Sequence, residues 1–191
     1  MPFFVLIRGA VFLYLTFSMP PWIALVVGAG MMFVVFFVYC MVLLSRTKRG
    51  LEYSRGAAVG TAIMVCVYCV YTGMFVSGIN VKHPEIKSTY RVLHPLLRVA
   101  LGTFIIVDEG VVVTSSSRKR GTYSKMGLAP LENSYHYVQK DGYVHAVDLR
   151  TVGRSWFSNS LMHSYFWLMG FRTLRHVGTA DHLHVSLAVA D

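Results

Sequence analysis

Three stretches in the last third of the chain contain the residue types that carry out hydrolytic chemistry. They are Thr114–Arg118, Ser134–His136 together with Ala146–Thr151, and Asp181–His184. Together they supply one histidine, one aspartate and a second histidine, with a further carboxylate three residues before that last histidine. Two imidazoles and a carboxylate are a ligand set of catalytic zinc, which keeps a position open for water. The further carboxylate is suited to act as the base on that water.

The composition divides the chain into an apolar first part and a polar second part. Hydrophobic residues make up 54% of the 191 residues, more than an ordinary soluble domain contains. All eight histidines, 13 of the 18 Lys+Arg and 8 of the 9 Asp+Glu lie after residue 79. We therefore predict a membrane anchor over residues 1–79 and a single small polar domain over residues 80–191.

Two uncharged stretches in the first part are long enough to cross a membrane. Trp22–Leu44 and Gly56–Ile79 contain 23 and 24 residues, and a helix rising about 1.5 Å per residue needs roughly 20 to span the hydrocarbon core. The apolar stretch 2–19 carries Arg8 and ends before Pro20-Pro21. A third span and an interfacial helix fit it equally well, so we expect two or three spans.

The segment Ser45–Arg55 between the two clear spans predicts the topology. Four of its eleven residues are basic, and short basic loops stay on the cytoplasmic side. The polar domain is then expected on the outer or periplasmic side. If the membrane is instead the internal membrane of a lipid-containing virion, the cytoplasmic and outer sides would correspond to different compartments. Small residues at Gly56 and Gly60 favour close helix packing, within this hairpin or between copies of the chain in a homo-oligomer.

The net charge of +9 suits an anionic partner such as a phospholipid surface or a cell wall. The sequence contains no basic helix repeat and no aromatic–basic module of the kinds that read nucleic acid. We therefore expect a lipid bilayer and a wall polymer as partners, and no nucleic acid.

The polar part has the pattern of an α+β domain with a small antiparallel sheet. We expect Asn133–Val138 and Val144–Leu149 to be the two arms of a hairpin, because the Asp141-Gly142 pair between them is a turn signal. The other expected elements are helices over Leu93–Leu101 and Ser155–Leu168 and strands over Gly110–Thr114, Phe171–His176 and Leu183–Val189.

Residues 90–191 resemble the M15 family of zinc peptidases, which includes D-Ala-D-Ala carboxypeptidases and L-alanyl-D-glutamate endopeptidases and shares its fold with the hedgehog domain. That family has a strand ending in Thr-Ser-x-x-Arg, then Ser-x-His-x-x-Gly-x-Ala-x-Asp, then an acidic residue three before a final histidine. The three stretches follow this order. The resemblance implies that His136, Asp148 and His184 hold Zn²⁺.

The resemblance also assigns the other residues of the site. It implies that Asp181 is the catalytic base, that Arg118 binds the peptide carboxylate or polarises the scissile carbonyl, and that Ser115 contacts the substrate. The chain departs from the family pattern in two ways. Asp181 stands where the family usually has glutamate, and eleven residues rather than six separate His136 from Asp148.

The longer spacing leaves two candidates for the first ligand. An insertion at the Asp141-Gly142 turn would keep His136, whereas His145 lies nearer to Asp148 in the sequence. We favour His136, because residues three apart in a strand point to opposite faces and His145 and Asp148 are three apart.

The function that the resemblance implies is a membrane-anchored zinc peptidase that hydrolyses peptidoglycan stem peptides, in wall remodelling or in host wall penetration and lysis by a phage. The shared ligands leave open which bond is cut. A non-catalytic zinc- or wall-binding module on a membrane anchor is the alternative. A channel is disfavoured, because neither Trp22–Leu44 nor Gly56–Ile79 contains a charged residue that could line an ion path.

Overall fold

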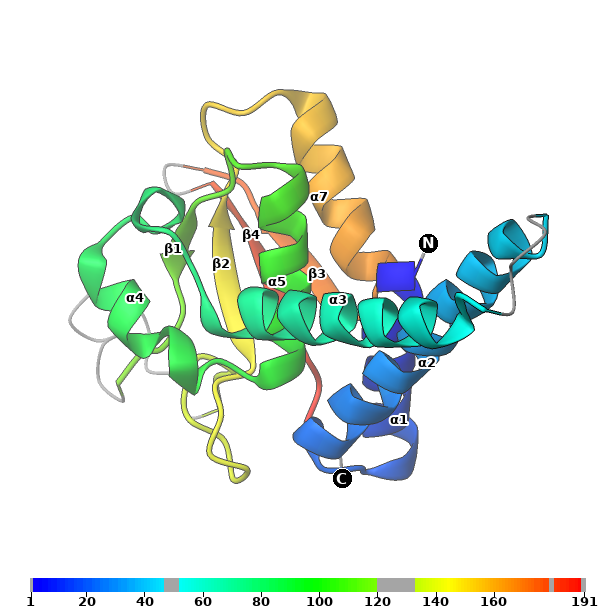
Figure 1. Ribbon diagram of the computed structural model, residues 1–191. Helices are drawn as coiled ribbons and strands as arrows, with labels where there is room; N and C mark the ends of the chain where they lie inside the picture. The colour runs from blue at the N-terminus through cyan, green and yellow to red at the C-terminus, as the bar shows by residue number, and fades with distance from the viewer. Residues whose placement is uncertain (1, 47–51, 120–132, 179–180, 190–191) are drawn as a thin grey trace.

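The computed structural model describes residues 2–46, 52–119, 133–178 and 181–189. In these ranges the chain forms an α+β fold with six α-helices and one antiparallel sheet of four strands in the order β1-β2-β4-β3 (Figure 1). The predicted α+β class with a small antiparallel sheet is therefore confirmed. The helices are α1 (Pro2–Phe17), α2 (Pro21–Leu44), α3 (Ser54–Met74), α4 (Pro84–Thr89), α5 (Pro95–Val107) and α7 (Trp156–Leu168). The strands are β1 (Val113–Ser115), β2 (Ala146–Arg150), β3 (Arg172–His176) and β4 (His182–Ser186).

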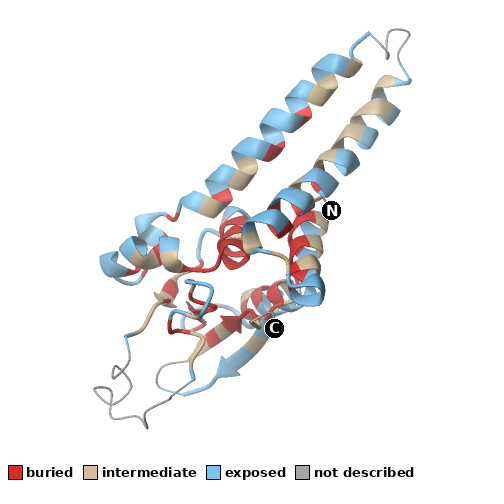
Figure 2. Ribbon diagram, turned by 90° about the horizontal axis from the view of Figure 1, so that it is seen from below, coloured by how far each residue is buried: buried red, intermediate tan, exposed pale blue. Residues whose placement is uncertain are grey.

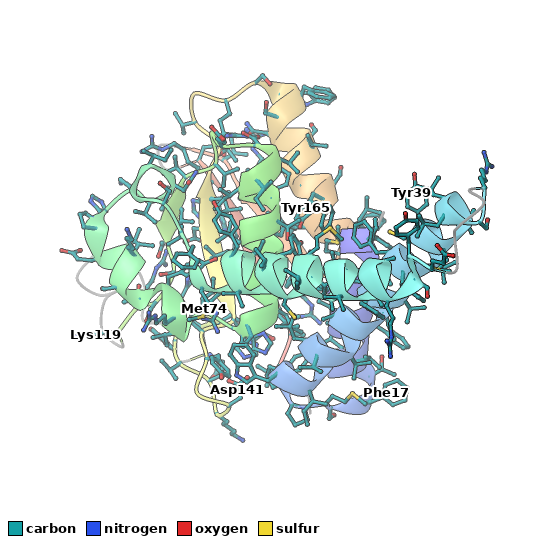
Figure 3. The ribbon with its side chains drawn as sticks, viewed as in Figure 1. Phe17, Tyr39, Met74, Lys119, Asp141 and Tyr165 are labelled. Atoms are coloured by element: carbon teal, nitrogen blue, oxygen red, sulfur yellow. The ribbon has the colours of Figure 1, made fainter. Side chains whose placement is uncertain are left out.

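Helices α2 and α3 form a long hairpin whose outer part extends away from the rest of the molecule (Figure 2). They contain 24 and 21 residues and are long and apolar enough to cross a membrane. In the most apolar 18-residue stretch of each helix, only 22% and 17% of the residues are buried. Apolar side chains therefore cover much of their outward surfaces, as in helices that contact lipid. Tyr39 and Met74 mark opposite ends of this hairpin (Figure 3). The predicted basic loop between the helices lies partly outside the described residues.

The first helix, α1, packs against the polar part of the chain as well as against α2. Its buried side is formed by Leu6, Ile7, Ala10, Val11 and Tyr14. The guanidinium of Arg8 lies against Gly170, just after the end of α7, where the helix dipole favours a cation. Arg8 therefore contacts the polar part of the protein.

Helix α5 is the element on which the apolar and polar parts meet. Ten of its 13 residues are buried. Helix α3 crosses it at Gly102, where a Cβ atom would collide with the backbone of Thr72, and the Tyr68 hydroxyl is hydrogen-bonded to Thr103. One buried cluster continues from Leu6 to Leu187, so the hydrophobic core extends across the predicted boundary between residues 79 and 80.

The sheet separates an apolar face from a polar one. Leu149 pairs with Leu183, and both are buried against the helical side, on which α5 and α7 lie (Figure 1). Asp148 pairs with His184 one position along each strand. Since successive side chains of a strand point to opposite faces, Asp148 and His184 project together from the other face.

The predicted hairpin around Asp141-Gly142 is wrong in its first arm. Asn133–Val138 forms a turn closed by the hydrogen bond from Tyr137 N to Ser134 O, and only Val138 makes an isolated bridge, to Val144. Strand β2 pairs instead with β1 and β4. Its neighbours on both sides are already strands, so the 133–138 segment has no free sheet edge to join.

Candidate metal centre

The structure brings together the three residues predicted to be metal ligands. Asp148 lies in β2, His184 in β4, and His136 in the turn before β2. Asp148 Oδ1 is 2.9 Å from His184 Nδ1 and 3.2 Å from His136 Nε2, and the two imidazole nitrogens are 3.3 Å apart. These three ligand atoms form a group that could hold a metal ion.

The hydrogen bonds around His136 show why this group suits a cation. His136 Nδ1 lies 2.6 Å from the Ser116 carbonyl oxygen, which can only accept, so Nδ1 carries a proton. In the neutral ring Nε2 is then a lone-pair donor, and it faces a carboxylate oxygen and a second imidazole nitrogen. A single proton can bridge only one pair of these three atoms. A metal ion with bonds of about 2.0–2.2 Å satisfies all three together.

Arg118 and Ser115 hold the other side of the Asp148 carboxylate. Arg118 donates to Asp148 Oδ2 at 2.6 Å and through Nε to Ser115 Oγ at 3.0 Å. Burial acts to raise the pKa of Asp148, but the contacts with the His136 and His184 imidazoles and the nearby Arg118 charge hold that pKa well below its usual range. Asp148 is therefore ionised at any pH at which the protein is expected to work.

The predicted base, Asp181, is not brought into this group. Its carboxylate accepts hydrogen bonds from Thr151 Oγ1 at 2.6 Å and from Arg175 Nη2 at 2.9 Å. Thr151 and Arg175 line a polar depression that α7 also borders, on the face of the sheet opposite Asp148. The cause is the spacing, because Asp181 and His184 are three residues apart across a strand. The Arg175 and Thr151 hydrogen bonds lower the pKa of Asp181.

His182 is the additional titratable group that β4 places beside the three ligand atoms. It lies two residues before His184 and so shares its face, with Nε2 3.7 Å from Asp148 Oδ1. Its ring stacks on His176 of β3 with centroids 4.8 Å apart. Burial, followed by the neighbouring His182 and His184, lowers the pKa of His176. The half-buried edge of the centre is thus formed by imidazoles.

His145, the alternative first ligand, lies elsewhere. Its Nε2 is 2.8 Å from Asp141 Oδ2, and with His94 these residues form a second group that could hold a metal ion. His145 and Asp148 are three residues apart, and this odd spacing predicted that their side chains would lie on opposite faces of the strand. Sequence reasoning missed His94 and Asp141 as site residues. The Asp141–His145 spacing across a turn was a visible signal, whereas His94 is brought there only by tertiary packing.

Sequence reasoning also missed the part played by the Ser116 carbonyl, which orients the His136 ring. No side-chain pattern could have revealed it, because the contact is made by a backbone oxygen. The Arg118 backbone N–H donates to the His136 carbonyl at 2.9 Å, so the Ser115–Arg118 segment holds both the ring and the backbone of this residue.

Comparison with known proteins gave no match: no protein-family model, no curated protein and no solved structure is similar to this chain by these searches. The case for a function therefore depends on the geometry of the centre and on the motif resemblance.

Proposed function

We propose that this protein is a membrane-attached zinc peptidase that hydrolyses peptide bonds in peptidoglycan stem peptides. The observation that carries the proposal is the convergence of His136 Nε2, Asp148 Oδ1 and His184 Nδ1 within 3.3 Å of one another. These atoms come from segments up to 48 residues apart in the chain, in the order of the motifs that resemble M15 peptidases.

The donor set fits zinc. Two imidazoles and a carboxylate leave a tetrahedral ion one position for water, and two of the three ligand residues, His136 and Asp148, are buried while His184 is partly exposed. Zinc bound there would supply a Lewis acid and a water of lowered pKa.

Arg118 has two roles in this proposal. Its Nη2 atom is committed to Asp148, which keeps the carboxylate ionised and oriented. The guanidinium is only partly buried, with 17% of its side chain exposed, and it carries further N–H donors. Those donors suit the carbonyl or carboxylate oxygen of a peptide placed beside the ligands. Ser115, whose hydroxyl accepts from Arg118, positions that guanidinium.

The proton transfers have two candidate groups. Asp181, the base implied by the resemblance, would have to leave Arg175 and Thr151 to reach the centre. His182 already lies on the correct face, with Nε2 3.7 Å from Asp148. Imidazole exchanges protons near neutral pH, so we assign His182 the role of taking a proton from the attacking water and returning it to the leaving amine.

The membrane hairpin would keep the enzyme close to its polymer. Helices α2 and α3 contact α5, directly beneath the sheet that carries the centre, so the centre is attached rigidly to the anchor. The positive-inside argument places this domain on the outer side, where peptidoglycan lies, and the excess of basic residues suits an anionic wall.

The test is incubation of purified peptidoglycan with the full chain in detergent or a lipid nanodisc, followed by mass spectrometry of new termini. We expect new amino and carboxyl termini within the stem peptide with the zinc-loaded protein and none with His184→Ala. Hydrolysis that persists in His184→Ala and in the presence of a chelator would contradict the proposal. Zinc binding without turnover on any wall fragment would favour the alternative, a non-catalytic wall-binding module.

A further inference from the structure

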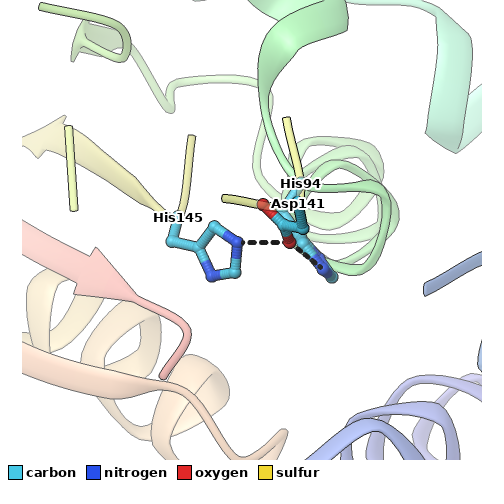
Figure 4. A group of neighbouring side chains, drawn as sticks. All are labelled: His94, Asp141 and His145. Carbon is cyan, nitrogen blue, oxygen red and sulfur yellow. Dashed lines mark hydrogen bonds and ion pairs between the residues drawn. The ribbon is translucent and has the colours of Figure 1, made fainter. Parts of the chain in front are cut away.

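A second cluster of metal-ligating side chains lies at the junction between the N-terminal helices and the polar part. It consists of His94, Asp141 and His145, whose ligand atoms all lie within 4.8 Å of one another. The Asp141 carboxylate stands between the two imidazole rings, with Oδ2 2.8 Å from His145 Nε2 and 3.9 Å from His94 Nε2 (Figure 4). None of these residues belongs to the first centre.

The contact between His145 and Asp141 needs a proton or a metal ion between its two facing atoms. His145 Nδ1 lies 3.2 Å from the Leu187 carbonyl oxygen, so this nitrogen is the donor. The lone pair of Nε2 then faces the carboxylate oxygen at 2.8 Å, and two acceptors at this distance repel unless a proton or a metal ion lies between them. His145 is completely buried, and a proton there would create a buried imidazolium that must be desolvated to pair with Asp141. A metal ion in the same place leaves both imidazoles neutral.

His94 points a second buried nitrogen at the same place. The residue is completely buried, and its Nε2 atom has no hydrogen-bond partner. Burial disfavours a charged ring, so this imidazole suits the neutral form that a metal ligand must have. Its Nδ1 accepts a long hydrogen bond of 3.3 Å from Leu96 N, and that bond would be given up when Nε2 coordinates.

We propose that His94 Nε2, Asp141 Oδ2 and His145 Nε2 bind a divalent transition-metal ion, with zinc as the best fit. Two imidazoles and one carboxylate are ligands that zinc and its neighbours accept, whereas Mg²⁺ and Ca²⁺ prefer oxygen. Ligand atoms on one zinc lie no more than about 4.2 Å apart, so the site must contract slightly. Asp141 can move, because it lies in an exposed turn and 25% of its side chain is accessible to solvent.

The proposed site lies where α1, α2 and α5 meet the turn that carries Asp141, so a bound ion would hold these elements together. His94 directly precedes α5, and its backbone N–H donates to Val144 O at 2.9 Å. The ring of Tyr14 in α1 lies 4.8 Å from that of His94. The first turn of α2 reaches the same turn, because Trp22 Nε1 donates to Tyr143 Oη at 3.0 Å. The labelled Asp141 is close to this end of α2 in Figure 3.

The ion would therefore fix the segment that carries His136. Residues 136–148 contribute His136 and Asp148 to the first centre and Asp141 and His145 to the second. Binding at the second site ties the middle of this segment to α5 and so to the membrane helices. The role of the second ion is structural, and it does not depend on the reaction that the first centre carries out.

The test is the zinc content of the full chain in detergent, measured by elemental mass spectrometry after removal of loosely bound metal. We expect two zinc ions per wild-type chain, one in His184→Ala, one in Asp141→Asn, and none in the double variant. Asp141→Asn changes an exposed turn, so it should fold, and Glu109→Gln is the matched surface control that keeps both ions.

Three results would overturn the proposal. They are the loss of all zinc in His184→Ala, the retention of two ions in Asp141→Asn, and an absorption spectrum of Co²⁺-loaded His184→Ala that lacks bands of tetrahedral nitrogen–oxygen coordination. Because the readout is metal content in a variant that lacks a ligand of the first centre, failure of the peptidase proposal would leave this result unaffected.

Discussion

His136 Nε2 lies 3.2 Å from Asp148 Oδ1, although the opposite ring nitrogen of His136 is already bound to the Ser116 carbonyl. The ring therefore turns a lone pair towards a carboxylate that also accepts a hydrogen bond from Arg118 at 2.6 Å. Two buried acceptor atoms that face each other, as His136 Nε2 and Asp148 Oδ1 do, form a favourable place for a cation. The predictions for the first centre depend on this contact.

Arg118→Gln should weaken zinc binding at the first centre by about 10–100-fold, because partners of a metal-binding carboxylate typically contribute that much. The change leaves Asp148 Oδ2 without its charged donor. Competition with a chromophoric chelator measures the affinity. Arg118→Lys should retain part of it, and the neighbouring Lys119→Gln is the matched control. Equal affinity in Arg118→Gln and wild type would show that the Asp148 contact does not support the metal.

His182→Gln and Asp181→Asn separate the two candidate proton carriers. If His182 carries the proton, His182→Gln should lower kcat by roughly 10²–10⁴-fold at unchanged zinc content. Asp181→Asn should then lower kcat only a few-fold, because the Arg175 contact that it weakens lies on the other face of the sheet. The assay is hydrolysis of a synthetic stem peptide. The opposite ranking would restore Asp181 as the base.

The metal-free protein should lose stability as the pH falls below about 6.5. Burial first, then His145 and Arg98, lowers the pKa of His94 to about 2 from an ordinary value of 6.5. Below pH 6.5 the unfolded chain binds a proton that the folded chain refuses, so acid favours unfolding, with a slope of up to about 1.4 kcal/mol per pH unit for one such group.

Denaturant unfolding at a series of pH values measures this slope. His94→Gln removes the titrating ring and should flatten the curve between pH 6.5 and 5, whereas the exposed His83→Gln should not. The titratable groups around His94 are His145, Asp141, Arg98, Tyr14 and Tyr143. Curves of equal slope in His94→Gln and wild type would exclude His94 as the cause.

Gly102→Ala should destabilise the packing of the α2–α3 hairpin on α5 by about 1–3 kcal/mol, the usual cost of overpacking. A Cβ atom at Gly102 would overlap the Thr72 backbone, which cannot move aside as a flexible side chain can. Thermal unfolding in detergent measures the change. Gly60→Ala is the control, because its Cβ would meet nothing within 4 Å. Equal unfolding temperatures for both variants would mean that α3 and α5 separate easily.

Much of the fold follows from local pattern. The long uncharged runs predicted α2 and α3, and apolar spacing predicted α5 and α7, because helical periodicity is a property of neighbouring residues. The spacing argument also separated His145 from Asp148 correctly. The same argument applies to Asp181 and His184, and the structure places their side chains on opposite faces.

The sequence by itself determined that Asp148 and His184 lie in strands and that His145 and Asp181 point away from them, because side-chain alternation follows from chain geometry. Only the tertiary structure decided which backbone carbonyl orients His136, how His94 reaches Asp141 and His145, and that α1 packs against the polar part. Those contacts join segments far apart in the chain through hydrogen bonds and shared burial, and no local pattern of residues encodes them.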